Sequence, residues 1–214
     1  VDVELWATQV RLHPANNVVE RKALLRPDVF DHEERAVLRK AMAVPGSVFV
    51  DVGGNAGLYS LDAALHAGEG ATIITIEPEA SLMNRFVFNL AQAYRLGRIA
   101  ASVTSVRHCV AVSDHDGSGF LSASGDEGSR NILGERSAAG QKVMLQTLES
   151  IVRVAGFEQI DVIKIDVEGY EDKVLPPFLA AVPESLWPRT IIIEHIQRAK
   201  WDPDCIVDAE QRGY

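Results

Sequence analysis

Residues Val48–Gly57, VFVDVGGNAG, carry the strongest structural signal in the chain. An apolar run breaks into small residues, and a helical pattern follows. A second stretch, Val162–Glu171 (VIKIDVEGYE), is another apolar run, and it ends in carboxylates. In open α/β sheets, ligands bind in the crevice at the carboxyl ends of the strands. We therefore expect the first stretch to form a ligand-binding loop and the second to form the edge of an active site.

The composition indicates a globular, acidic protein. With 214 residues and 47% hydrophobic content, the chain can bury a sizeable core in one domain. The net charge of −9 disfavours binding to phosphate backbones, so we expect no nucleic-acid partner. Cys109 and Cys205 form neither a disulfide framework nor a metal knuckle, which favours a reducing cytoplasm. No apolar run is long enough for a membrane segment.

Strand-like and helix-like segments alternate along the chain. Strands are expected at residues 48–52, 72–77, 103–112, 143–145, 162–166 and 190–195, and helices at 31–43, 58–66, 80–96, 147–155 and 208–214. Asp31 and Glu34 are typical of a capping box. A helix after residue 166 must end near Pro176-Pro177. This alternation predicts an α/β fold, with a mostly parallel sheet and helices on both faces.

Two regions depart from the alternation. Residues 1–46 are expected to form a helical or irregular lead-in to a domain that spans residues 47–214. Residues 114–141 hold six Gly, five Ser and little apolar periodicity, which indicates a long flexible insertion. We expect this insertion to be a mobile flap over a binding site, with an irregular surface hairpin as the alternative.

The glycine loop has the features of a nucleoside site. Gly53, Gly54 and Gly57 let the backbone turn sharply, and the following helix offers free N–H groups. A dinucleotide motif reads Gly-x-Gly-x-x-Gly, but Asn55 stands where the second glycine belongs. Glu77 follows Gly53 by 24 residues, where a carboxylate can accept both ribose hydroxyls. The alternative is a plain tight turn with a solvated Glu77.

Several segments resemble successive motifs of the FkbM family of S-adenosylmethionine-dependent methyltransferases. They are residues 51–57 (DVGGNAG), 76–78 (IEP), 111–114 (AVSD), 164–171 (KIDVEGYE), 147–150 (TLES) and 193–195 (IEH). In residues 147–150, Glu149 stands where the family's Thr-Leu-Asp-Ser segment has Asp. The resemblance runs from about Ser47 to His195. It implies a Rossmann-like class I methyltransferase fold with S-adenosyl-L-methionine as cofactor.

The resemblance also implies roles for single residues. Asp51 would orient the ammonium group of the cofactor, Glu77 would take the ribose hydroxyls, and Ser113-Asp114 would flank adenine. A turn or helix-cap pair is the alternative for Ser113-Asp114. The residues expected to bind the cofactor are Asp51, Gly53, Gly54, Asn55, Gly57, Glu77, Ser113, Asp114 and Asp166.

Two residues are candidates for the chemistry. Methyl transfer to oxygen needs a positioned hydroxyl and often a base, and Asp166 or His195 can serve. His195 can equally be a strand-end histidine that hydrogen-bonds a neighbour. Lys164 is expected to pair with a carboxylate within the sheet. Asp166, Glu168, Glu194 and His195 raise the question of a hard cation, but no ligand spacing is diagnostic, and we expect no catalytic metal.

The sequence thus predicts an O-methyltransferase that acts on a hydroxyl of a sugar or secondary metabolite, with a small-molecule or glycan acceptor. An NAD-type oxidoreductase, disfavoured by Asn55, and a non-catalytic nucleoside-binding module are the alternatives. A class I sheet has two more strands after its fifth, but only about 19 residues follow His195. We therefore expect five main strands, with the last two cut off or disordered.

Overall fold

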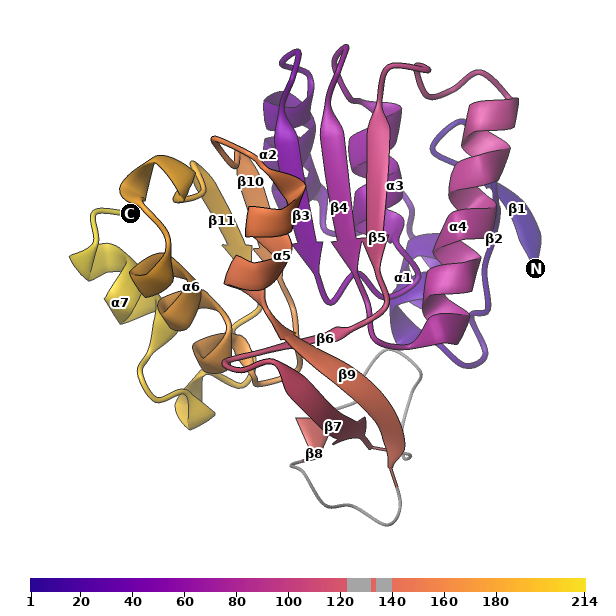
Figure 1. Cartoon of the computed structure of the whole chain (residues 1–214). Coiled ribbons are helices and arrows are strands. Elements are labelled where there is room, and N and C mark those ends of the chain that lie inside the picture. Colours follow the sequence, from indigo (N-terminus) through magenta and orange to yellow (C-terminus); the bar gives the residue numbers. More distant parts are fainter. Residues whose placement is uncertain (123–131, 134–139) are drawn as a thin grey trace.

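A computed structural model describes residues 1–122, 132–133 and 140–214 of the chain. Its centre is a five-stranded parallel sheet with the order β11-β10-β3-β4-β5 (Figure 1). The strands are β3 (Val48–Val52), β4 (Thr72–Ile76), β5 (Thr104–His108), β10 (Val162–Ile165) and β11 (Thr190–Ile193). Every residue of β3 and β10 is buried, as expected for central strands covered on both faces.

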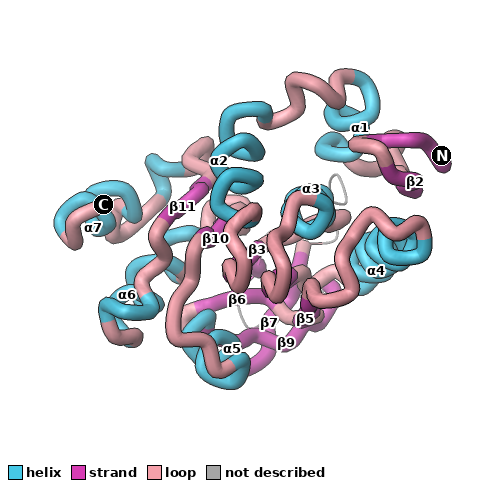
Figure 2. Tube along the Cα trace, turned by 90° about the horizontal axis from the view of Figure 1, so that it is seen from above, coloured by secondary structure: helices cyan, strands magenta, loops and turns pink. Residues whose placement is uncertain are grey.

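Helices cover both faces of this sheet (Figure 2). Phe49 and Ile73 point into a core with α2 (His32–Met42), α3 (Leu58–Leu65) and α4 (Ala80–Arg95). Val50 and Ile74 point the other way, into a core with α5 (Leu148–Ala155), α6 (Leu175–Ala181) and α7 (Cys205–Gln211). This alternation is the period-two geometry of a strand. The predicted Rossmann-like architecture is confirmed.

The chain after β11 contains no further strand. Residues 194–214 hold only a short 3-10 helix, Arg198–Lys200, and α7. The expected five-stranded main sheet is therefore confirmed. Helix α7 starts earlier than predicted, because the Asp204 carboxylate caps it by accepting the backbone N–H groups of Ile206 and Val207.

A second sheet lies beside the first, with the order β6-β9-β7-β8. Its strands are β6 (Ala111–Ser113), β7 (Gly117–Leu121), β8 (Ile132–Leu133) and β9 (Gln141–Thr147). The prediction of one strand over 103–112 is wrong, because pairing with β4 stops at His108 and residues 111–113 pair with β9 instead. Residues 123–131 and 134–139, most of the expected flap, lie outside the described residues.

The N-terminal segment packs into the main core. It forms a hairpin of β1 (Asp2–Leu5) and β2 (Thr8–Arg11), followed by α1 (Val18–Leu25). Leu5, Val10 and Leu12 are buried in the same core as α3 and α4. The Asn89 side chain of α4 accepts the N–H of Arg11 at 2.6 Å and donates to its carbonyl at 3.1 Å. The sequence did not predict this hairpin.

Two expected helix ends differ in the structure. Asp31 adopts a left-handed φ of +42° and makes no capping bond, so the capping-box prediction is wrong. Its carboxylate accepts the Tyr59 hydroxyl at 3.0 Å instead. Pro176 and Pro177 begin α6 rather than end a helix, because the first turn of a helix needs no proline N–H. Among the described residues, no helix has both the length and the apolar character to cross a membrane.

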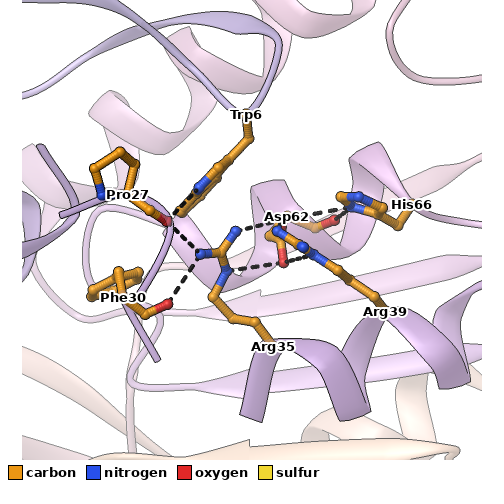
Figure 3. Close-up of polar contacts among 7 residues, drawn as sticks. All are labelled: Trp6, Pro27, Phe30, Arg35, Arg39, Asp62 and His66. Carbon is orange, nitrogen blue, oxygen red and sulfur yellow. Dashed lines mark hydrogen bonds and ion pairs between the residues drawn. The ribbon is translucent and has the colours of Figure 1, made fainter. Parts of the chain in front are cut away.

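A buried charge cluster joins α2, α3 and the N-terminal hairpin (Figure 3). Asp62 of α3 is fully buried and accepts two hydrogen bonds each from Arg35 and Arg39 of α2, at 2.8–3.1 Å. The Arg35 guanidinium lies 3.6 Å from the centre of the Trp6 ring and also donates to the carbonyl of Phe30. The cluster fixes the segment that leads from α1 into α2.

Candidate functional site

Two adjoining cavities open at the carboxyl ends of the central strands. The Glu77 cavity, of about 250 Å³, is bounded by Ile76–Glu79, Val110–Val112 and residues of α1. The Lys164 cavity, of about 340 Å³, is bounded by Tyr59, Lys164 and His195. Both include Val19, Lys22, Gly53, Asn55, Asp166, Glu194 and Ile196. They lie where the strand order reverses between β3 and β10, the position of ligand sites in open α/β sheets.

The glycine loop lies directly against the end of β10. Gly53 has a left-handed φ of +75°, and a Cβ there would stand 1.9 Å from the carbonyl oxygen of Asp166. The N–H groups of Gly53 and Gly54 both donate to the carbonyl of Ile76 at 3.0 Å. Only glycine at position 53 therefore permits the close approach of the two central strand ends.

Asn55 connects this loop to α1. Its side-chain oxygen accepts the Asn17 amide at 2.6 Å and the backbone N–H of Ala56 at 2.6 Å. Asn17 is fully buried and caps α1 by accepting the N–H of Glu20. This connection holds α1 over both cavities, where Val19 and Lys22 form part of the wall. Helix α1 was not predicted from the sequence as part of the site, because an N-cap asparagine does not indicate what its helix covers.

Glu77 borders the Glu77 cavity, and its carboxylate oxygens can accept further hydrogen bonds. Its two oxygens accept the backbone N–H groups of Asn55 and Glu79, each at 2.8 Å. Burial raises the pKa of Glu77 to about 7. A carboxylate has about four lone-pair sites, so both oxygens can accept further bonds from a ligand. The arrangement fits a pair of vicinal hydroxyls.

Two of the expected cofactor residues, Asp51 and Gly57, lie beneath the loop and line neither cavity. Asp51 is fully buried and accepts the Ser60 hydroxyl at 2.6 Å, and burial raises its pKa. Its Oδ1 is buried without a hydrogen-bond partner among the described residues. A Cβ on Gly57 would meet the Phe86 ring at 2.1 Å. Asp51 and Gly57 therefore contribute to the shape of the loop. Gly54, by contrast, borders the Lys164 cavity.

Ser113 and Asp114 also lie outside both cavity walls. The Ser113 hydroxyl donates to Asp114, and Asp114 pairs with His115 at 2.7 Å. The apolar residues Val110–Val112 form the wall instead.

An ion pair holds Asp166 in place. The Lys164 ammonium donates to Asp166 Oδ2 at 2.9 Å and lies 4.9 Å from the centre of the Tyr59 ring. Burial opposes the charge of Lys164, but Asp166, Asp51 and Glu194 outweigh it, so its pKa is raised. The expectation that Lys164 pairs with a carboxylate in the sheet is confirmed.

The turn after β10 is fixed by Glu171, at the start of the 3-10 helix Glu171–Lys173. Glu171 is buried, and its Oε1 accepts the N–H groups of Val167 at 3.0 Å and Gly169 at 3.2 Å. Its Oε2 accepts the indole N–H of Trp201 at 2.9 Å. Glu171 therefore fixes the backbone that directly follows Asp166. It is not part of either cavity wall.

Glu194 and His195 follow β11. The Glu194 N–H donates to the carbonyl of Ile165 at 3.0 Å, which places it beside the end of β10. Glu194 borders both cavities, whereas His195 borders only the Lys164 cavity. Burial, followed by the negative charges of Asp166, Glu168 and Glu171, raises the pKa of Glu194 to about 7. From the sequence, Glu194 was a candidate only as a cation ligand, because its raised pKa depends on burial and on residues from a distant segment.

The fold and the paired cavities define an α/β protein with a candidate ligand site at the switch point of its sheet. The chain belongs to the FkbM methyltransferase family, since a profile of the methyltransferase FkbM domain matches residues 51–207. S-adenosylmethionine is accordingly its cofactor. Glu77, which borders the first cavity and whose oxygens can accept further hydrogen bonds, fits the ribose hydroxyls of this group.

Other known proteins are similar to the chain. The AMB antimetabolite synthetase AmbE of Pseudomonas aeruginosa is 27% identical over 161 residues, which cover 61% of this chain and 8% of that protein. A precorrin-6y C5,15-methyltransferase structure from Geobacter metallireducens is 12% identical with a TM-score of 0.46, covering 85% of this chain and 71% of that one. A methyltransferase from Thiobacillus denitrificans, solved with S-adenosyl-L-homocysteine, is 16% identical with a TM-score of 0.37, covering 76% and 47%.

Proposed function

We propose that the chain is an O-methyltransferase whose acceptor is a hydroxyl of a sugar or secondary metabolite. The observation that supports this best is the junction of two cavities at Asp166, one beside Glu77 and the other beside Lys164. S-adenosylmethionine, when bound, supplies an electrophilic methyl group. A reducing cytoplasm suits the two free thiols, Cys109 and Cys205.

The Glu77 cavity would hold the nucleoside end of the cofactor. Glu77 would accept the ribose hydroxyls, and Val110–Val112 would pack against adenine. The backbone of Gly53, which borders both cavities, and of Gly54, which borders the Lys164 cavity, would lie along the amino-acid portion. Residues 47–214 would then form the methyltransferase domain, with α1 from the N-terminal segment closing one side of the cavity.

The Lys164 cavity would hold the acceptor. Asp166, fixed by Lys164, would accept a hydrogen bond from the reacting hydroxyl and so orient its oxygen. The carboxylates of Asp31 and Glu34 also border this cavity, as does His195. A wall rich in hydrogen-bond acceptors suits an acceptor that carries several hydroxyl donors, as a sugar does.

Two other functions are less well supported. An NAD-type oxidoreductase needs a glycine where Asn55 stands, and the Asn55 side chain is engaged by Asn17 at 2.6 Å. A non-catalytic nucleoside-binding module would leave the second cavity and its Lys164–Asp166 pair without a role.

Cofactor binding should be visible in the melting temperature. At a concentration 100-fold above Kd, S-adenosylmethionine should add about 2.7 kcal/mol to the unfolding free energy, or roughly 5–10 °C to Tm. NAD should leave Tm unchanged. Glu77→Ala should weaken binding by about 1–3 kcal/mol, because it removes the partner of the ribose hydroxyls. Differential scanning fluorimetry and calorimetric titration measure both effects.

Glu69→Ala is the matched control, since Glu69 is exposed and precedes β4 at the opposite edge of the sheet. It should bind S-adenosylmethionine as the unchanged protein does. Stabilisation by NAD alone would contradict the proposed cofactor site. The reaction itself is tested by release of S-adenosylhomocysteine with a panel of sugars and hydroxylated small molecules. Cofactor binding without turnover on any of them would favour the non-catalytic module.

A further inference from the structure

Only three charged side chains among the described residues border both cavities. They are Lys22, Asp166 and Glu194. If the cofactor and the acceptor occupy the two cavities, the reacting atoms meet at this shared wall. A group that takes the hydroxyl proton must be a base and must stand there. Lys22 is an exposed cation, so the choice lies between the two carboxylates.

Asp166 is already engaged by a cation. Its Oδ2 accepts the Lys164 ammonium at 2.9 Å, and Lys164 is itself buried. A proton on Asp166 would cancel the charge that balances Lys164 and leave a buried ammonium with a weakened partner. The Lys164 side chain is only 10% exposed, so loss of its partner's charge would be costly. Asp166 is therefore better suited to hold the hydroxyl than to deprotonate it.

Glu194 has the opposite properties. It is half-buried, and among the described residues no hydrogen bond or ion pair is formed by its carboxylate. Burial and nearby negative charge hold its pKa at about 7, so it exchanges a proton near neutral pH. General-base catalysis is most effective when the pKa lies near the working pH. The charged or titratable groups around it are Lys164 on β10, Asp166, Glu168 and Glu171 after β10, Lys22 on α1, and His195.

We propose that Glu194 is the catalytic base, an inference that rests on the proposed methyltransferase function. The acceptor oxygen forms a bond to the methyl carbon, and the carbon–sulfur bond breaks with its electron pair left on sulfur. The hydroxyl proton passes to the Glu194 carboxylate, which becomes a neutral acid and later releases the proton to water. His195 borders the acceptor cavity alone and is placed to contact the acceptor rather than the reacting atoms.

The decisive variant is Glu194→Gln, which keeps the size of the side chain and removes its basicity. We expect kcat to fall by about 10²–10⁴-fold, the usual contribution of a general base. In the unchanged enzyme kcat should rise with pH through a midpoint at or below 7, because only ionised Glu194 accepts the proton and the cofactor's positive charge favours ionisation. Glu194→Gln should lose this rise, whereas His195→Gln should keep it.

Glu184→Gln is the control, since Glu184 is exposed in the 3-10 helix Glu184–Leu186 and borders neither cavity. Affinity for S-adenosylhomocysteine, which lacks the sulfonium charge, should stay within about threefold in Glu194→Gln. If the unchanged protein does not bind this ligand, the proposed function fails. If it binds and Glu194→Gln keeps its turnover and pH profile, only the role of Glu194 is overturned.

A second measurement needs no acceptor. In protein labelled with ¹³C at glutamate carboxyl carbons, the resonance absent from Glu194→Gln identifies Glu194. Its titration midpoint should lie near 7 in the free protein, in line with the pKa set by its surroundings. A midpoint below about 5, close to that of an ordinary glutamate, would overturn the proposal even if no acceptor had been found.

Discussion

Gly53→Ala is expected to destabilise the protein by about 3 kcal/mol or more and to abolish cofactor binding. A Cβ at this position would stand 1.9 Å from the Asp166 carbonyl oxygen, which is backbone and cannot rotate away. The ends of β3 and β10 would have to separate, and overpacking of this kind adds to the strain of a left-handed alanine. Urea denaturation and calorimetric titration with S-adenosylhomocysteine measure the two losses.

Gly70→Ala is the control that measures the strain of a left-handed alanine without a steric clash. Gly70 has nearly the same φ, +72°, but nothing lies within 4 Å of its Cβ position. It should cost only about 1–2 kcal/mol, the penalty for a left-handed alanine, and leave ligand affinity unchanged. Equal destabilisation by the two variants, with binding retained in Gly53→Ala, would show that the strand ends are not in contact at position 53.

Asp62→Ala should lower the unfolding free energy by about 3–5 kcal/mol. The change leaves Arg35 buried without its carboxylate, and an uncompensated buried charge carries a penalty of this size. The Arg35 side chain is 3% exposed, whereas that of Arg39 is 32% exposed. Arg39→Ala should therefore cost no more than about 1 kcal/mol, as for other solvent-screened pairs.

Denaturant unfolding monitored by circular dichroism compares these two variants. Loss of Asp62 should also loosen the segment around Phe30 and Asp31, which borders the Lys164 cavity. A destabilisation by Asp62→Ala of under 1 kcal/mol would show that Arg35 reaches water in solution and that the cluster does not hold α2 in place.

The parts of the fold that the sequence predicted are those with local signals. The apolar run Val48–Val52 followed by glycines is a signal within ten residues, and it identified the first strand and its loop correctly. Glu77 was also predicted from the sequence to border a ligand site, because the end of its strand has an equally clear local signal. The end of the third strand was misplaced, because β6 exists only through pairing with β9, some 34 residues later in the chain.

The candidate site was harder to predict because distant segments build it. Asn17 and Asn55 are 38 residues apart, so no local pattern shows that α1 covers the cavities. Glu194 acquires its raised pKa from burial and from acidic residues in the segment that follows another strand, β10. The sequence predicted that Lys164 pairs with a carboxylate, and the structure shows that the partner is Asp166, two residues later in the chain.

A crystal structure of the protein with S-adenosylhomocysteine would locate the cofactor directly. The proposed site predicts the ribose hydroxyls within hydrogen-bonding distance of Glu77 and adenine against Val110–Val112. It also predicts the sulfur at the shared wall, facing Asp166 and Glu194. A ligand bound outside the Glu77 cavity, or a sulfur pointing away from Asp166 and Glu194, would contradict the proposed site and the direction of methyl transfer.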